Sequence, residues 1–348
     1  MTDITEPAAT LHRIASRSAP PPPEEIAAEF DATRSVLESE PSERRPRDTR
    51  GRPGGIVSVR SDLPTVVVPD VHARIDLIIS VLSSRFPEHG IDEMLLNALA
   101  EERAQLVFVG DYVHGEARAR ERWVNAFREF TSGYKRHTAI DNEMRESLGA
   151  LGAFAVLKRT FPATVHGLKG NHENIANEEG GGNHPFGKFV YEGAMVAEYM
   201  ARFYAGDAYE SVYRLEKALP LVVVGGSFIV THAEPARFFP VDEVIEYHDR
   251  PDVVEGLTWT DNDAAEPGSV EATIAHYLPH CDPNGAIHLG GHRPVAGRYA
   301  LRAGGRYVQF HNPSRMLVAL PPANRAFDPE RDVVEIEPSE AIFDGKDR

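Results

Sequence analysis

Residues 65–73 read Thr-Val-Val-Val-Pro-Asp-Val-His-Ala, and this stretch indicates the kind of fold that the chain adopts. The β-branched run at 65–68 favours a strand, which Pro69 ends because proline cannot donate to a strand ladder. Residues 74–86 follow with apolar side chains at helical spacing and predict a helix. A buried strand that leads directly into a helix is the repeating unit of α/β folds.

The same alternation continues through the first half of the chain, and strands dominate the second half. Apolar runs predict strands at 105–109 and 164–168, and residues 117–160 read as mostly helical with a break near 131–133. Later segments predict helices at 186–205 and 207–217 and strands at 221–224, 227–231, 286–289, 299–302, 306–310 and 316–320. This order predicts an α/β domain in which two sheets pack together and helices cover the outside.

Polar side chains follow the predicted strands at the point where each strand ends. These residues are Asp70, His72, Asp111, Asn171, His232 and His292. Because ligands bind at the carboxyl ends of strands in open α/β sheets, we expect one convergent site. Oxygen and nitrogen donors without thiolates favour Mn, Fe or Zn. Six donors are too many for one tetrahedral zinc, and they suit two metal ions that share a carboxylate.

Six segments also resemble the motifs of calcineurin-like metallophosphoesterases, in the same order. Their layout is most similar to that of the serine/threonine phosphoprotein phosphatases, in a divergent bacterial-type form. Residues 69–73 resemble GDxHG, residues 110–115 resemble GDYVDRG, and residues 170–173 match GNHE completely. The remaining segments are 219–235, which resembles the His-Gly-Gly region, 257–261, which resembles LLWSDP, and 291–293, which matches the late histidine motif.

The resemblance implies a calcineurin-like layered β-sandwich flanked by helices, with two divalent metal ions, of which Mn is favoured over Fe or Zn. It implies that Asp70 and His72 hold the first ion and that Asp111 bridges the two. The second ion is then held by Asn171, His232 and His292. His172 is the implied general acid, which protonates the leaving oxygen.

The chain departs from this family at two positions. The protein phosphatases have an aspartate that orients the general acid and an arginine that clamps the phosphate, where this chain has His114 and Gly115. His114 is therefore a candidate for orienting the acid. The phosphate needs another cation, and the candidates next to motifs are Arg74, Arg237 and Arg293.

These features predict a hydrolase that cleaves phosphate esters by metal-activated hydroxide. We expect a phosphomonoesterase that resembles the serine/threonine protein phosphatases and acts on a phosphorylated protein or small molecule. The two departures motivate an alternative, a phosphodiesterase or a hydrolase of nucleotide polyphosphates of the dinucleoside tetraphosphate type, because a better leaving group needs less acid catalysis. A third alternative is a non-catalytic metal-binding module.

Composition sets the wider expectations. A net charge of -16 argues against nucleic acid as the main partner, and one cysteine allows no intramolecular disulfide. The chain shows neither a signal-peptide pattern nor an apolar run that could cross a bilayer, so we expect a cytoplasmic protein without a membrane partner. We expect a disordered N-terminal tail over 1–60, the catalytic domain over 61–321 and an acidic C-terminal tail over 322–348, with 333–336 as a candidate edge strand.

Overall fold

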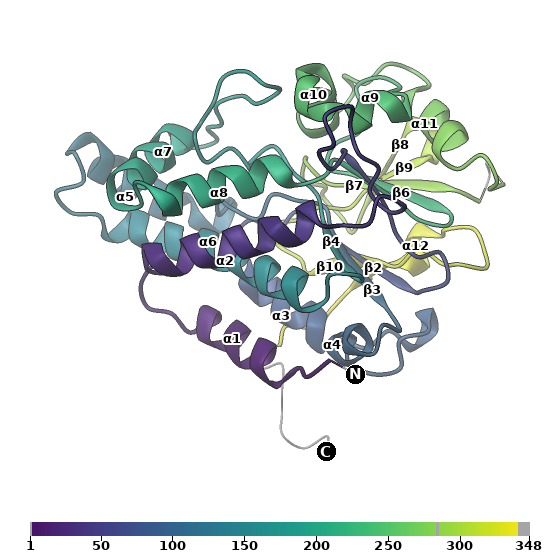
Figure 1. Cartoon of the computed structure of the whole chain (residues 1–348), viewed down its shortest axis with the longest axis horizontal. Coiled ribbons are helices and arrows are strands. Elements are labelled where there is room, and N and C mark those ends of the chain that lie inside the picture. The colour runs from purple at the N-terminus through teal and green to yellow at the C-terminus, as the bar shows by residue number, and fades with distance from the viewer. Residues whose placement is uncertain (1, 283–284, 340–348) are drawn as a thin grey trace.

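The computed structural model describes residues 2–282 and 285–339, and its centre is a pair of stacked β-sheets (Figure 1). The first sheet has five strands in the order β11 (Val333–Glu335), β10 (Leu317–Ala319), β2 (Thr65–Val68), β3 (Gln105–Phe108) and β4 (Val165–Gly167). The second has six strands in the order β1 (Ile56–Ser58), β5 (Val222–Val224), β6 (Phe228–Thr231), β7 (Ile287–Gly290), β9 (Tyr307–Gln309) and β8 (Ala300–Arg302). Two stacked sheets flanked by helices confirm the predicted fold class.

Alternating side chains of the strands build the core between the two sheets. In the first sheet, Val67 of β2 points inward with Val107 of β3, and Val230 of β6 meets them from the second sheet. Val66 and Val68 point to the opposite face and pack under helices. This alternation is the period of two that strands impose, and here it buries both faces of β2.

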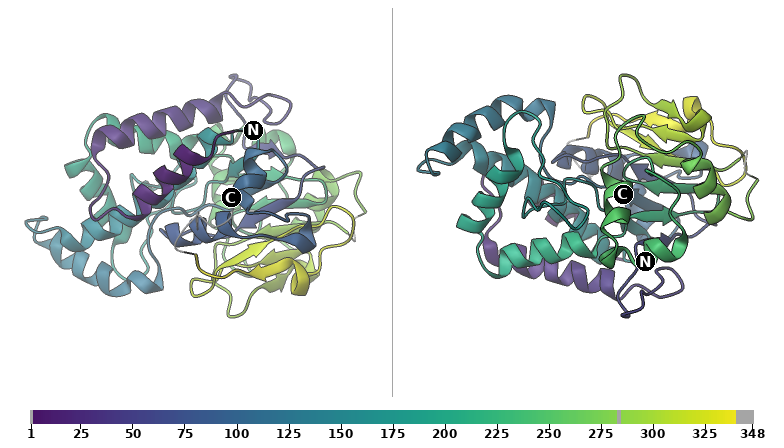
Figure 2. Two further views of the ribbon diagram at one scale, coloured as in Figure 1. Left: turned by 90° about the horizontal axis from the view of Figure 1, so that it is seen from below. Right: turned by 90° about the horizontal axis from the view of Figure 1, so that it is seen from above.

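Helices cover both outer faces. The five-stranded sheet is covered by α1 (Thr5–Ala15), α2 (Pro23–Glu38), α3 (Ile75–Ser83), α4 (Leu95–Ala100), α5 (Arg120–Thr131), α6 (Thr138–Thr160), α7 (Glu192–Phe203) and α8 (Asp207–Ala218). The six-stranded sheet is covered by α9 (Val241–Ile245), α10 (Pro251–Thr258) and α11 (Ser269–Tyr277). In both views of Figure 2, α5 to α8 and α2 project to one side of the sheets. None of the helices in the described ranges is long and apolar enough to cross a membrane.

The N-terminal region differs from the predicted disordered tail over 1–60. It contains α1, α2 and the edge strand β1, and α2 packs between α6 and α8 (Figure 1). Its apolar residues are few, but Ile26, Phe30 and Leu37 fall on one face of α2 and are buried. A single well-placed stripe is enough to dock a helix, although the average composition of the segment is polar. The prediction of a tail was therefore wrong.

A buried cluster of charged side chains connects the N-terminal region to α6 and β4. Glu40, just after α2, accepts hydrogen bonds from Lys158 Nζ of α6 at 2.6 Å and from Arg45 Nη1 at 3.0 Å. Lys158 also donates to the carbonyl of Val165 in β4, and Arg45 donates to the carbonyl of Ala218. Because each buried charge has an opposite charge and further partners, the cluster can lie in the interior.

The C-terminal segment forms structure where an edge strand was a candidate. β11 pairs antiparallel with β10, and the short helix α12 (Pro329–Asp332) precedes it. Asp328 caps α12 by accepting from the backbone N–H of Glu330. The expectation of an edge strand at 333–336 is confirmed. The part of the predicted acidic tail beyond residue 339 lies outside the described residues.

Candidate metal centre

Loops that follow five strands bring the predicted ligand residues to one edge of the sandwich. Asp111, after β3, lies between two histidines: its Oδ2 is 3.5 Å from His72 Nε2 and 3.4 Å from His232 Nε2. Asp70, after β2, has its Oδ1 3.8 Å from His232 Nδ1. All four side chains are buried. The carboxylate predicted to bridge two ions thus occupies the middle of the cluster.

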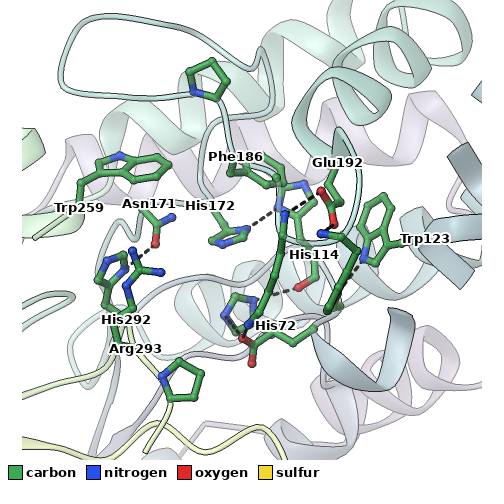
Figure 3. Close-up of a pocket in the computed structure, with 17 residues that line it drawn as sticks. His72, His114, Trp123, Asn171, His172, Phe186, Glu192, Trp259, His292 and Arg293 are labelled. Carbon is green, nitrogen blue, oxygen red and sulfur yellow. Dashed lines mark hydrogen bonds and ion pairs between the residues drawn. The ribbon is translucent and has the colours of Figure 1, made fainter. Parts of the chain in front are cut away.

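The last two predicted ligands complete the same cluster. Asn171 Oδ1, after β4, is 3.0 Å from His232 Nε2. The same oxygen is 2.9 Å from His292 Nδ1 (Figure 3). The backbone N–H of His292 donates to Asp70 Oδ2 at 2.8 Å. The structure therefore brings together all six residues that the strand ends predicted.

The loops that carry these residues adopt unusual backbone conformations. The left-handed region, which few non-glycine residues occupy, contains His72 at a φ of 44°, Asp111 at 49°, His114 at 68° and His292 at 66°. Backbone strain of this kind concentrates at functional sites because the surrounding structure must hold it in place. In this chain, these conformations direct the side chains of His72, Asp111 and His292 toward one small volume.

Glycines next to the ligands allow the carboxylates to lie against the backbone. A Cβ on Gly291 would lie 1.9 Å from Asp70 Oδ1, and one on Gly170 would lie 2.1 Å from Asp111 Oδ1. The buried carboxylate of Glu173 locks two of the loops together, because it accepts from the backbone N–H groups of Gly170 at 2.7 Å and Asp111 at 2.8 Å. These contacts explain why a glycine precedes Asn171 and His292 in the motifs.

The chemistry of the donors fits metal ions. Within the described ranges, Asp70 Oδ1, Asp111 Oδ2 and His292 Nε2 are buried and have no hydrogen-bond partner. Burial raises the pKa of Asp70 to about 6. Burial and the nearby carboxylates of Glu173 and Asp70 raise the pKa of Asp111 well above its ordinary value. Burial lowers the pKa of His72 to about 4, so its ring stays neutral and keeps a lone pair. Divalent ions would satisfy these atoms at once.

The predicted general acid lies beside the cluster. The backbone N–H of His172 donates to Asp111 Oδ1 at 2.9 Å, and its ring Nδ1 is 3.1 Å from His114 Nδ1. The ring of Phe186 packs on both imidazoles, with centroids 4.6 Å from His172 and 4.1 Å from His114 (Figure 3). His114 thus occupies the place expected of a residue that orients His172.

The predicted phosphate-binding arginines do not all reach the site. Arg293 lines a cleft of about 240 Å³ above the cluster and forms an ion pair with Asp261. The guanidinium of Arg74 instead donates to backbone carbonyls, including that of Asp70, and Arg237 pairs with acidic residues outside the cleft. Arg74 and Arg237 do not line this cleft, so the expectation that they contact a phosphate there does not hold.

Several residues of the cleft were missed in the sequence. Lys188 lines it and forms an ion pair with Glu116, at 2.9 Å between Nζ and Oε1. Phe186 also lines the cleft, as does Trp259, which lies in the segment 257–261 that resembles LLWSDP. Proximity to the motifs could have pointed to these residues. Phe186 and Lys188 lie in the loop that follows GNHE, and Glu116 follows the segment that resembles GDYVDRG.

Solved structures that are similar to this chain include two phosphatases. A structure of a protein serine/threonine phosphatase from Saccharomyces cerevisiae, described as similar to human phosphatase PP5, has a TM-score of 0.52 and 15% identity, and the match covers 91% of this chain and 89% of that chain. A cold-active protein-tyrosine phosphatase of a psychrophile, Shewanella sp., gives a TM-score of 0.43 and 11% identity over 87% of this chain and 84% of that one. At 15% identity, the likeness to the yeast structure concerns the fold alone.

Among curated proteins, none matches this chain in sequence. The family model for calcineurin-like phosphoesterases, however, matches residues 63–315, which include every strand-end residue of the cluster. That range covers most of the chain and agrees with the two-sheet fold and with the grouping of buried carboxylates and imidazoles. The chain therefore belongs to the calcineurin-like phosphoesterase family and is a metal-dependent phosphoesterase.

Proposed function

We propose that this enzyme hydrolyses phosphomonoesters at a centre of two divalent metal ions, with Mn²⁺ as the favoured metal. The observation that carries the proposal is the convergence of six buried donors, several without a hydrogen-bond partner, beneath an open cleft. The proposed ligands of the first ion are Asp70 and His72, with Asp111 shared between both ions. The proposed ligands of the second are Asn171, His232 and His292.

When bound, two divalent ions supply Lewis-acid polarisation of a phosphoryl group and activation of water. The side chains around them have separate tasks. His172 holds the proton that the leaving oxygen takes, and its position is fixed by its backbone bond to Asp111 and its ring contact with His114. Arg293 and Lys188 are the cations of the cleft that can approach the non-bridging oxygens of a phosphate.

The test is a substrate panel on the metal-free chain supplied with Mn²⁺. It contains p-nitrophenyl phosphate, bis(p-nitrophenyl) phosphate, a dinucleoside tetraphosphate and a phosphoserine peptide, and the matched variant is Asp70→Asn. We expect the monoesters to be cleaved fastest and the variant to lose at least about 1,000-fold in kcat/KM, because a ligand of the ion is removed. Equal activity of the two proteins would exclude the assigned site.

The second candidate is cleavage of a phosphodiester or a nucleotide polyphosphate. The observation that favours it is the contact between His114 and His172 at 3.1 Å, where a neutral imidazole takes the place of a carboxylate. A neutral partner stabilises the protonated acid less than a carboxylate does, so substrates with good leaving groups are favoured. In the same panel, this candidate predicts faster turnover of the diester or the tetraphosphate than of the phosphopeptide.

A further inference from the structure

A further imidazole reaches the metal centre from a segment that none of the motifs includes. His311 lies in the loop after β9 and is completely buried. Its Nδ1 is 3.8 Å from Asp70 Oδ2, and its ring centroid is 5.3 Å from that of His72. One donor atom from each of Asp70, His72 and His311 lies within 4.8 Å of the other two. The three side chains therefore surround one small volume.

The two ring nitrogens of His311 have different surroundings. Nε2 is 2.8 Å from Glu116 Oε2, whereas Nδ1 has no hydrogen-bond partner in the described part of the chain. A histidine that binds a metal usually donates its other N–H to a carboxylate or a backbone carbonyl, which fixes the tautomer. Glu116 accepts from Nε2–H in this way and leaves the lone pair of Nδ1 directed toward Asp70.

Two of the proposed ligands show the same division between their nitrogens. His72 directs Nδ1 to the carbonyl of His114 at 2.9 Å, and its Nε2 faces Asp111. His232 directs Nδ1 to the carbonyl of Val109 at 3.3 Å, and its Nε2 also faces Asp111. His311 therefore has the surroundings of a ligand, with one nitrogen held by an oxygen and the other facing a buried carboxylate.

Glu116 lies close to the first-ion site, with its Oε1 3.7 Å from His72 Nε2, but both of its oxygens already accept hydrogen bonds. Its Oε2 is taken by His311, and its Oε1 accepts from Lys188 Nζ at 2.9 Å. Neither of its oxygens is among the buried atoms without a partner, in contrast to one oxygen each of Asp70 and Asp111. Glu116 thus links the buried imidazole to a lysine at the cleft.

A free ring nitrogen alone does not mark a ligand. His288 in β7 is also completely buried, its Nε2 is 2.7 Å from Thr231 Oγ1, and its Nδ1 has no hydrogen-bond partner among the described residues. However, His288 belongs to none of the groups of carboxylates and imidazoles that the described residues form. It offers a matched control for the loss of a buried imidazole.

We propose that His311 is a seventh protein ligand of the metal centre, which joins Asp70 and His72 at the first ion, and that Glu116 is its positioning residue. This inference rests on the proposed two-metal function. Two atoms that each lie about 2.1 Å from one ion are at most about 4.2 Å apart, and Nδ1 and Asp70 Oδ2 meet that limit at 3.8 Å. With His311 the first ion has four protein ligands, as the second has.

Equilibrium dialysis of the metal-free full chain against Mn²⁺ tests this assignment without measuring activity. The proteins are the wild type, His311→Asn, Glu116→Gln and the control His288→Asn. We expect two Mn²⁺ per wild-type chain and unchanged Kd values in the control. In His311→Asn one of the two Kd values should rise at least about 100-fold, and in Glu116→Gln about 10- to 100-fold, as expected for loss of a group that orients a ligand.

Anomalous diffraction from wild-type crystals soaked in Mn²⁺ keeps the proposal testable if His311→Asn does not fold. A peak in direct contact with His311 Nδ1 supports it. A peak that contacts Asp70 and His72 but not Nδ1, or unchanged Kd values in a folded His311→Asn, excludes the seventh ligand while the proposed function stands on hydrolysis by the wild type. If the wild type binds two Mn²⁺ but cleaves no phosphate ester, the proposed function fails and the ligand assignment is judged on the metal data alone.

Discussion

Asp70 and Asp111 are buried carboxylates pressed against the backbone of a neighbouring motif. The side chain of Asp70 lies over Gly291, and that of Asp111 lies over Gly170. Glycine is needed at these two positions because a Cβ would overlap the carboxylate of Asp70 or Asp111. The spacing between a carboxylate and the imidazoles around it depends on this close approach.

Gly291→Ala should move the carboxylate of Asp70, because the new Cβ would lie 1.9 Å from Oδ1. We expect kcat/KM to fall by about 100-fold, since a displacement of about 1 Å can cost this much. Mn²⁺ affinity should fall with it. The control is Gly297→Ala, where a Cβ meets nothing within 4 Å. Wild-type activity in Gly291→Ala would mean that Asp70 is not held as described.

In the proposed function, the contact between His114 and His172 sets the strength of the general acid. Nδ1 of a histidine and Oδ1 of an aspartate are the same number of bonds from Cα, so His114→Asp can place a carboxylate oxygen near His172 Nδ1, which is 3.1 Å from His114 Nδ1. The carboxylate favours the protonated imidazole. We expect a gain of about 10-fold or more in kcat for phenyl phosphate relative to p-nitrophenyl phosphate.

His114→Asn is the isosteric neutral control for this change. It should leave the ratio of the two rates near the wild-type value, because an amide carries no charge. Equal ratios in His114→Asp and His114→Asn would show that the residue at position 114 does not act through His172.

Among the elements, the strands from β2 onward were predictable, whereas β1 and the two N-terminal helices were not. The run at 65–68 became β2 with the same bounds because its β-branched residues are followed at once by Pro69. The strands predicted at 221–224 and 227–231 are the antiparallel pair of β5 and β6. The stripe on α2 could have been found from its helical spacing, which the polar average of residues 1–60 concealed.

The metal cluster was predictable for a related reason. Each of its six residues lies within four residues of the end of a strand, so local sequence placed them at one edge. The contacts of Glu116, Lys188 and His311 were not predictable, because they join segments far apart in the chain. Side-chain packing between loops, which has no periodic signal, decides such contacts.

Glu40→Gln should reduce stability by about 3 kcal/mol, because Lys158 and Arg45 would remain buried without their carboxylate. The control is Glu38→Gln, which removes the exposed pair with Arg34 and should cost less than about 1 kcal/mol. Urea denaturation of both variants measures the difference. Equal stability of Glu40→Gln and the wild type would contradict the role given to this cluster.

The stabilisation that Glu40 provides should depend on pH. Burial raises the pKa of Glu40, but the charges of Lys158 and Arg45 outweigh it and hold the pKa below its ordinary value. A lowered pKa gives stabilisation that is complete above the pKa of the unfolded chain and is lost as the pH falls through the folded value. The gap in stability between wild type and Glu40→Gln should therefore narrow in acid.

For the whole molecule, the two sheets, their helical covers and the N-terminal helices form one continuous arrangement. The cluster of buried apolar residues that holds the five-stranded sheet includes Leu11 of α1 and Phe30 of α2 together with residues of α6 and α8. The sheets that carry the candidate metal centre therefore depend on a layer of helices. The first two of these helices, α1 and α2, precede residue 63, where the family match begins.

Deletion of residues 2–39 should destroy cooperative folding. It removes buried Leu11, Ile26, Phe30 and Leu37, each worth about 1.5–3 kcal/mol, and it uncovers α6 and α8. The milder variant Phe30→Ala should cost about 3–5 kcal/mol. Thermal unfolding followed by circular dichroism measures both. A shortened chain with the Tm and activity of the full chain would mean that the N-terminal helices are dispensable.

In the proposed function, the carboxylate of Asp111 is shared by two divalent ions, and ester hydrolysis depends on both. The most direct test is titration of the metal-free chain with Mn²⁺ while p-nitrophenyl phosphate hydrolysis is followed, in the wild type and in Asp111→Asn. We predict that wild-type activity saturates at two Mn²⁺ per chain and that Asp111→Asn falls by at least about 1,000-fold. Full activity without metal, or wild-type turnover in Asp111→Asn, would contradict the claim.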